Sequence, residues 1–142
     1  MTESSGSIGA VHRMPLRVYY EDTDAAGIVY YANYLKFAER GRTEMMRELG
    51  FAHRQIAEDI GTLFTVRRCS VDYRAPARLD DALIVETRVQ EIGAATVLLD
   101  QRVRREGEVL AQIDMLVACV GRDGRPRRVP AGVRAALMKL PS

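Results

Sequence analysis

The fold of this chain is decided by the stretch Val18-Tyr19-Tyr20-Glu21-Asp22-Thr23-Asp24-Ala25-Ala26-Gly27-Ile28-Val29-Tyr30-Tyr31-Ala32-Asn33-Tyr34. It begins as a strand, because Leu16, Val18 and Tyr20 are apolar and alternate with more polar neighbours. Two carboxylates and a turn of small residues follow. Apolar residues then recur every three or four positions, which is typical of one helix face. These positions are Tyr34, Phe37, Ala38, Gly41, Met45 and Leu49. The sequence therefore predicts a strand, a loop and a long helix.

The predicted helix has recognisable ends. Asn33 is a suitable N-cap residue, and Gly50 stands where a left-handed residue commonly ends a helix. Asp24 then lies in the loop just before the helix N-terminus, where backbone amides lack partners and carry the positive end of the helix dipole. A carboxylate beside amides that can stabilise an anion could serve catalysis. Aspartate is also common in turns for structural reasons alone, so both readings stay open.

Length and composition bound the possible classes of protein. The chain has 142 residues, 47% of them hydrophobic and 28% charged, which fits a single globular domain with a sizeable core. We expect residues 1–13 to form a disordered tail and residues 14–142 to form the domain. No apolar run approaches the ~20 residues that span a bilayer. The tail has no apolar signal core, so we expect a cytoplasmic protein.

The net charge and the number of possible metal-ligating residues exclude further classes of protein. The formal net charge of +2 argues against nucleic-acid binding. Only His12 and His53 are available, so no His/Cys zinc spacing exists. The pair Asp22 and Asp24 could be read as metal ligands, but no further ligands support that reading. We therefore expect no metal and no cofactor, and we expect Asp22 to be structural or electrostatic rather than catalytic.

The rest of the chain is mainly strands. A short helical piece is expected at about 52–59 and an amphipathic helix at about 131–139. Strand patterns cover residues 62–73, 83–89, 96–105 and 109–120. Successive strands joined by tight turns pair antiparallel, which predicts an α+β fold with the sheet curved around the long helix. The last strand is apolar on both faces and is expected to be central.

Residues 19–34 resemble the signature of hotdog-fold acyl-CoA thioesterases. They are similar to the 4-hydroxybenzoyl-CoA thioesterase family and, more closely, to the YbgC-type, Tol–Pal-associated group. The similarity continues through Glu39-Arg40-Gly41-Arg42-Thr43-Glu44, Val66-Arg67-Arg68 and Tyr73-Arg74-Ala75-Pro76-Ala77-Arg78-Leu79-Asp80-Asp81. The resemblance implies a hotdog fold, in which a five-stranded antiparallel sheet wraps a central helix. It also implies a homodimer or homotetramer with the active site at the subunit interface.

The same resemblance implies an acyl-CoA thioesterase that hydrolyses its substrate to a free acid and coenzyme A. In the family, the carboxylate that matches Asp24 attacks the thioester or activates water, and the two roles stay open. The backbone amide that matches Tyr31, at the helix N-terminus, binds the thioester oxygen. Gly27 and Tyr34 are expected to contact the substrate. The acyl group and its carrier, coenzyme A or acyl carrier protein, are not specified by any motif.

The chain departs from the family pattern in two places. YbgC-type proteins usually have histidine where Tyr31 stands, which leaves an amide-donor role intact. Related enzymes often carry basic residues at the turn that matches residues 92–95, where they hold the phosphates of coenzyme A. Here that turn is neutral, so Arg88 or Arg104 is expected to take this role. Glu39 is a reserve catalytic candidate. The alternative function is a hotdog protein that binds acyl carriers or partner proteins without turnover.

Overall fold

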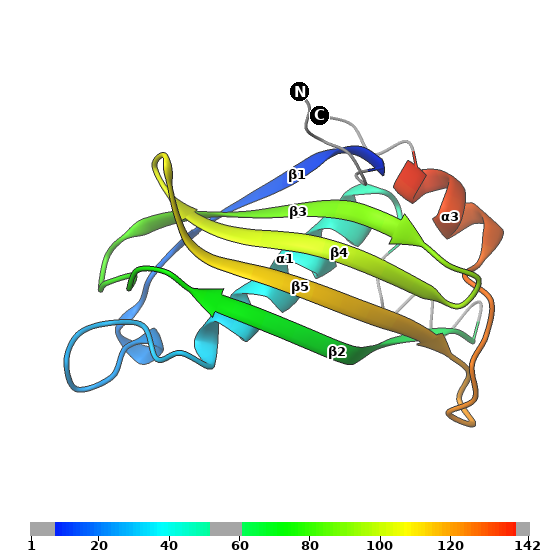
Figure 1. Ribbon diagram of the computed structural model, residues 1–142, viewed down its shortest axis with the longest axis horizontal. Helices are drawn as coiled ribbons and strands as arrows, with labels where there is room; N and C mark the ends of the chain where they lie inside the picture. The colour runs from blue at the N-terminus through cyan, green and yellow to red at the C-terminus, as the bar shows by residue number, and fades with distance from the viewer. Residues whose placement is uncertain (1–7, 52–60, 139–142) are drawn as a thin grey trace.

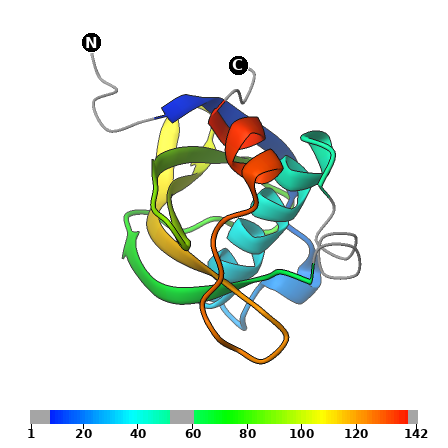
Figure 2. The same ribbon diagram turned by 90° about the vertical axis from the view of Figure 1, so that its right-hand side faces the viewer.

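A single curved sheet wraps one long helix in the computed structural model, which describes residues 8–51 and 61–138 (Figures 1 and 2). The five antiparallel strands are ordered β1-β3-β4-β5-β2, and α1 packs against their concave face. In chain order the elements are β1 (Ile8–Arg17), the 3-10 helix η1 (Tyr20–Asp22), α1 (Asn33–Glu48), β2 (Leu63–Tyr73), β3 (Ala82–Ile92), β4 (Thr96–Arg105), β5 (Glu108–Val120) and α3 (Ala131–Met138). The predicted α+β architecture is confirmed.

The beginning of the chain differs from the prediction. β1 starts at Ile8, so residues 8–13 are not part of a disordered tail as expected. Pairing with β3 explains this difference, since His12 lies opposite Thr87 in the ladder. The strand also ends at Arg17 rather than continuing through Tyr20, which belongs to η1. The short helix expected at 52–59 lies outside the described residues.

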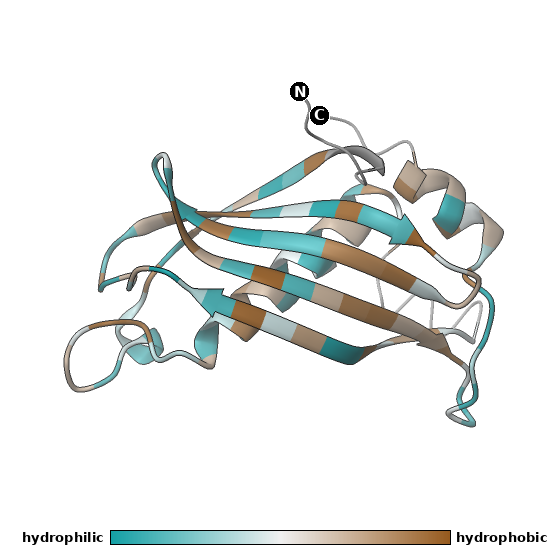
Figure 3. Cartoon of the chain, in the orientation of Figure 1, coloured by the Kyte–Doolittle hydropathy of each residue, from teal (hydrophilic) through white to brown (hydrophobic). Residues whose placement is uncertain are grey.

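The strand expected at the centre of the sheet is an interior strand but not the central one. β5 lies between β4 and β2, and β4 is the middle strand of the five. Hydrophilic and hydrophobic bands alternate along the strands in Figure 3. Side chains of β5 such as Ile113 and Met115 are buried, whereas Asp114 between them is exposed. The face toward α1 therefore forms the core, and the opposite face is more polar.

A buried glutamine connects α1 to the sheet. Gln101 of β4 donates through Nε2 to the Ala38 carbonyl at 2.9 Å and to Thr87 Oγ1 at 3.0 Å. Its Oε1 accepts from Arg42 Nη1 at 3.0 Å. Buried polar groups are costly without partners, and here both ends of the amide are paired. This bonding fixes the position of α1 over β3 and β4.

The C-terminus of α1 follows the prediction. Gly50 adopts a φ of +91°, its amide donates to the Arg47 carbonyl, and the Phe51 amide donates to the Met46 carbonyl. These two bonds form a Schellman motif.

Among the described residues, no helix is long and apolar enough to cross a membrane.

Gly41 allows the close approach of α1 to β3. A Cβ at this position would lie 2.7 Å from Val85 Cγ1 and 3.3 Å from Thr87 Oγ1. We therefore expect Gly41→Ala to lower the free energy of unfolding by about 1–3 kcal/mol, even though alanine favours a helix over glycine by about 1 kcal/mol. Chemical denaturation measures the change. Gly132→Ala in α3 is the control, because its nearest contact would be an ordinary 3.4 Å to Phe51. A Gly41→Ala protein as stable as the wild type would contradict this packing.

Candidate active site

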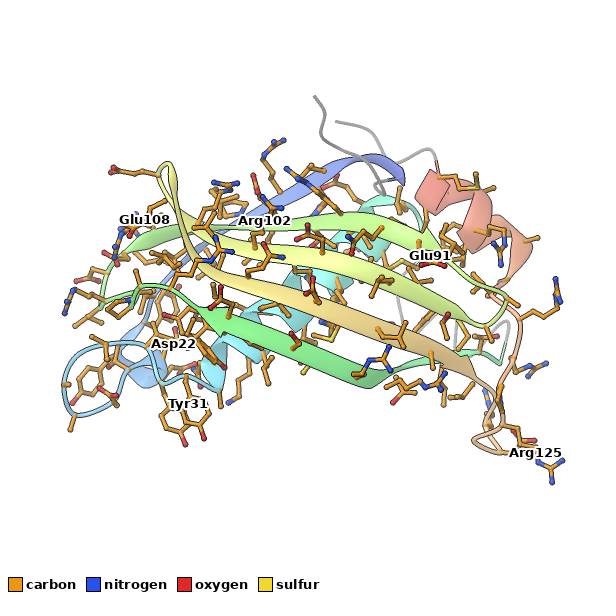
Figure 4. All side chains as sticks on the ribbon, in the orientation of Figure 1. Asp22, Tyr31, Glu91, Arg102, Glu108 and Arg125 are labelled. Carbon is orange, nitrogen blue, oxygen red and sulfur yellow. The ribbon has the colours of Figure 1, made fainter. Side chains whose placement is uncertain are left out.

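The loop between β1 and α1 is held at its base by Asp22. This carboxylate is 4% exposed and accepts hydrogen bonds from the Tyr19 amide at 2.9 Å and from Asn33 Nδ2 at 3.0 Å. The Asp22 carbonyl accepts from the Tyr30 amide at 3.0 Å. Figure 4 shows Asp22 at the junction of η1 and the start of α1. Asp22 therefore has the structural role that the sequence analysis favoured.

The predicted helix cap is wrong in its details. Ala32 is the N-cap residue and makes no side-chain capping bond, whereas Asn33 is the first residue of α1. The Asn33 side chain instead turns back to bond the buried Asp22 carboxylate. A buried acceptor eleven residues away competes for the amide group, and local sequence alone could not reveal it.

Asp24 lies in a tight turn that projects from this loop. Its backbone amide donates to the Ile28 carbonyl at 2.9 Å, and its carbonyl accepts from the Gly27 amide at 3.0 Å. Gly27 adopts a φ of +78°, a conformation that glycine accommodates without strain. Asp24 Oδ1 accepts from the Ala26 amide at 2.8 Å, and the side chain is exposed. Within the described chain Oδ2 has no partner, so it is free to react.

This turn is fastened to the segment that follows β2. The Val29 amide donates to the Ala77 carbonyl at 2.8 Å, and the Leu79 amide donates to the Gly27 carbonyl at 3.3 Å. Ile28 and Arg78 form an isolated antiparallel bridge. The Asp24 turn therefore rests on residues 77–79 rather than moving freely, and Gly27 contributes to its attachment.

Tyr31 presents an unpaired amide at the beginning of α1. Its carbonyl accepts from the Tyr73 hydroxyl at 3.0 Å and from the Tyr34 amide at 3.4 Å. Its own amide has no acceptor among the described residues. Amides at a helix N-terminus are directed outward and carry partial positive charge. The Tyr31 amide is therefore able to hydrogen-bond an anionic oxygen.

Tyr31 also lines a cavity of about 360 Å³. The cavity is lined by Ile28, Val29, Tyr31, Tyr34, Tyr73, Arg74, Ala75 and Pro76. The rings of Tyr31 and Tyr34 each meet the ring of Tyr73 edge-on. Apolar and aromatic walls with few polar groups are characteristic of small-molecule sites. This cavity can hold an acyl or aromatic group next to Tyr31.

Tyr34 and Tyr73, which line the cavity, both have hydroxyl groups that are already hydrogen-bonded. Tyr34 is buried, and its hydroxyl accepts from the Ala77 amide at 2.9 Å. Burial raises the pKa of Tyr34, and burial together with neighbouring groups also raises that of Tyr73. Both phenols therefore stay neutral at pH 7 and act as walls. Sequence reasoning missed Tyr73, although its position at the end of a strand before Arg74-Ala75-Pro76 was a usable signal.

The structure brings only some of the predicted site residues together. Tyr31 and Tyr34 line the cavity, and Gly27 and Asp24 share the adjoining turn. Arg88 and Arg104 do not line it. Arg104 Nε donates to Glu86 Oε1 at 2.7 Å, so a carboxylate already neutralises this arginine.

Comparison with known proteins identifies the family. Residues 26–112 match the thioesterase superfamily. The chain belongs to this superfamily. It is 45% identical over 127 residues to the acyl-CoA thioesterase YbgC of Haemophilus influenzae, covering 89% of this chain and 93% of that protein. It is 43% identical over 126 residues to the acyl-CoA thioester hydrolase YbgC of Escherichia coli O6:H1, covering 87% and 92%.

Solved structures agree with this assignment. A probable thioesterase from Bartonella henselae superimposes with a TM-score of 0.83 at 34% identity, covering 85% of this chain and 100% of that one. A 1,4-dihydroxy-2-naphthoyl-CoA thioesterase from Synechocystis superimposes with a TM-score of 0.85 at 20% identity, covering 92% and 98%. The second likeness shows the fold. This chain is therefore a hotdog-fold thioester hydrolase.

A second cavity of this thioesterase lies between α1 and β2. It has a volume of about 290 Å³ and is lined by Glu39, Arg42, Met45, Met46, Phe64, Thr65, Val66, Val97, Leu99, Val117 and Leu137. Burial lowers the pKa of the Arg42 guanidinium, and the charge of Glu39 partly offsets this effect. Glu39 faces this cavity rather than the Tyr31 amide. Asp24 therefore remains the preferred candidate for the carboxylate that acts beside the Tyr31 amide.

Proposed function

We propose that this thioesterase hydrolyses acyl-CoA to a free acid and coenzyme A. In this proposal Asp24 is the nucleophile or the general base, and the Tyr31 amide stabilises the oxyanion. The observation that carries the proposal is the unpaired amide of Tyr31, a residue that lines an apolar cavity and that lies close in the chain to the Asp24 turn. The names of the Haemophilus influenzae and Escherichia coli relatives support coenzyme A as the carrier.

Two sequences of steps fit these residues. As a nucleophile, the Asp24 carboxylate attacks the thioester carbonyl, and coenzyme A leaves as the thiolate and takes a proton from solvent. Water then hydrolyses the resulting anhydride and restores the carboxylate. As a general base, Asp24 takes a proton from water while that water attacks the carbonyl. The tetrahedral intermediate then breaks its carbon–sulfur bond, and coenzyme A leaves as the thiolate and takes the proton back from Asp24. In both cases negative charge develops on the carbonyl oxygen, where an oriented amide is most effective.

Release of free thiol from a panel of acyl-CoA esters tests this proposal. The panel includes short, long and aromatic acyl groups, and acyl carrier protein esters form a parallel series. We expect hydrolysis of at least one acyl-CoA, and we expect Asp24→Ala to remove it. Binding of acyl groups without any thiol release would instead support the alternative of a carrier-binding protein without turnover.

We expect catalysis to be independent of added metal. The Asp22 carboxylate is occupied by the Tyr19 amide and the Asn33 side chain, so it is not free to share a divalent ion with Asp24. Turnover should be unchanged after dialysis against EDTA. Magnesium and manganese, added back separately, should not stimulate it. Activity that is lost with EDTA and restored by a divalent ion would revive the metal-ligand reading of the two aspartates.

A further inference from the structure

The turn after β5 carries four arginines in eight residues. We call residues 121–128, Gly121-Arg122-Asp123-Gly124-Arg125-Pro126-Arg127-Arg128, the arginine loop. Its one carboxylate, Asp123, accepts from the Arg125 amide at 3.0 Å. Within the described part of the chain, the Arg125 and Arg128 side chains have no hydrogen-bond or ion-pair partner. The loop therefore exposes positive charge that the chain does not neutralise.

The arginine loop has a defined shape. The Gly121 amide donates to the Arg125 carbonyl at 2.9 Å, and the Arg127 amide donates to the Cys119 carbonyl at 2.9 Å. Gly124 supplies the left-handed residue of the turn, with a φ of +82°. The loop borders a concavity of about 550 Å³, lined by Gly61, Arg122, Asp123, Arg125, Pro126 and Arg127. Guanidinium groups around a concavity match the planar, bidentate recognition of phosphate.

The arginine loop and Tyr31 lie at opposite ends of one chain, as the labels of Arg125 and Tyr31 in Figure 4 show. Each end is next to one end of β2. Arg127 Nη1 donates to the Gly61 carbonyl at 3.3 Å, just before β2 begins. Tyr73, the last residue of β2, donates to the Tyr31 carbonyl. The loop is therefore beside the start of β2, and the Tyr31 cavity is beside its end.

This placement matters because β2 is an edge of the sheet. The other edge strand, β1, contains Pro15, which has no amide to donate and which is typical of a strand that does not pair further. β2 has no proline, and its Val66 is 46% exposed. If two β2 edges pair antiparallel, the start of each strand faces the end of the other. The arginine loop of one subunit then lies beside Tyr31 of the partner subunit.

We propose that the arginine loop binds the phosphate groups of the coenzyme A whose thioester reacts at the partner subunit's Tyr31. The inference rests on the proposed acyl-CoA substrate, which carries a diphosphate and a 3′-phosphate. Arg104, one of the two arginines predicted for this task from the sequence, fits it less well. Arg104 is paired with the Glu86 carboxylate, which also accepts from Arg13 at 3.3 Å. A phosphate near Arg104 would therefore meet a negatively charged carboxylate as well as the guanidinium group.

Kinetics with matched substrates test whether the arginine loop binds the phosphate groups of coenzyme A. We expect Arg125→Gln to raise the KM for acyl-CoA about tenfold with little change in kcat, and Arg125→Gln/Arg127→Gln to raise it further. The same acyl group on pantetheine, which lacks the nucleotide, should be hydrolysed equally by wild type and variants. Arg13→Gln on β1 removes one positive charge elsewhere and should leave both KM values unchanged. A similar loss with acyl-pantetheine, or no change with acyl-CoA, would overturn the proposal.

Binding of adenosine 3′,5′-bisphosphate separates this inference from the proposed reaction. Calorimetry on the wild-type assembly should detect binding that weakens at high salt and is reduced about tenfold by Arg125→Gln. This result would support the loop even if no acyl-CoA were hydrolysed, in which case the proposed reaction alone would fail. The alternative outcome is that the loop does not bind the bisphosphate but is needed for hydrolysis of acyl carrier protein esters. The loop would then contact an acidic protein, and the nucleotide proposal would be rejected.

Mixed assemblies test which subunit supplies the loop. Chains that carry Asp24→Asn and chains that carry Arg125→Gln/Arg127→Gln can be co-expressed with different tags and isolated as heterodimers. Each heterodimer then has one site with an intact Asp24 and an intact loop from the other chain. We expect recovery of acyl-CoA hydrolysis with the wild-type KM. Heterodimers that retain only the high KM would place the loop and Asp24 contributions in the same chain and would contradict the inference.

Discussion

Asp24→Asn is expected to lower kcat by at least about 10²-fold while the protein stays folded, because general-base assistance alone contributes on that order. Asparagine keeps the shape of the side chain and a carbonyl oxygen that can still accept from the Ala26 amide, so the turn should persist. It has neither a basic nor a nucleophilic carboxylate. Steady-state rates of thiol release, with substrate binding measured separately, give the result.

The neighbouring carboxylate provides a matched control. Glu21 is also exposed on this loop, and Glu21→Gln removes the same charge three residues away. We expect that variant to keep kcat within a fewfold of wild type, since its carboxylate has no proposed role. Thermal unfolding confirms that both variants are folded. Hydrolysis by a folded Asp24→Asn protein at nearly the wild-type rate would remove Asp24 from the mechanism and return Glu39 as the candidate.

The second large effect concerns assembly. We expect an active species of at least two chains, and a tetramer is the preferred form. Among the described residues no strand pairs with the outer side of β2, and exposed strand edges of this kind favour pairing with another chain. The cavity between α1 and β2, whose lining includes Val66, Met45 and Met46, is next to that edge and would also be covered. Activity should therefore depend on association.

Light scattering coupled to gel filtration measures the mass of the active species. Each fraction is assayed, and specific activity is followed as the protein is diluted. Specific activity should fall as the assembly dissociates. A monomer of 15.9 kDa with full activity would exclude a site shared between subunits. The alternative is a monomer whose edge is capped by its own C-terminal segment from Arg125 onward. In that segment Arg127 bonds the Gly61 carbonyl just before β2, whereas α3 packs on β1 and β3.

Local sequence determined much of this protein. The three- and four-residue spacing from Tyr34 to Leu49 predicted α1, and Gly50 predicted its end, because helix periodicity and left-handed caps depend on residues close in sequence. Alternation and turn residues predicted the four strands after it, with β4 at its observed bounds of Thr96–Arg105. Composition and spacing around Asp24 also placed it correctly in a loop before a helix.

Only the tertiary structure decided which residues meet across the chain. Pairing with β3 made residues 8–13 a strand, and the buried Asp22 diverted Asn33 from its expected capping role. Tyr73 joined Tyr31 at the cavity, although 42 residues separate them. Glu86 of β3 formed an ion pair with Arg104 of the neighbouring strand β4. These outcomes depend on strand order, register and burial, which bring distant residues into competition for the same partners. A pattern within one segment carries no information about those partners.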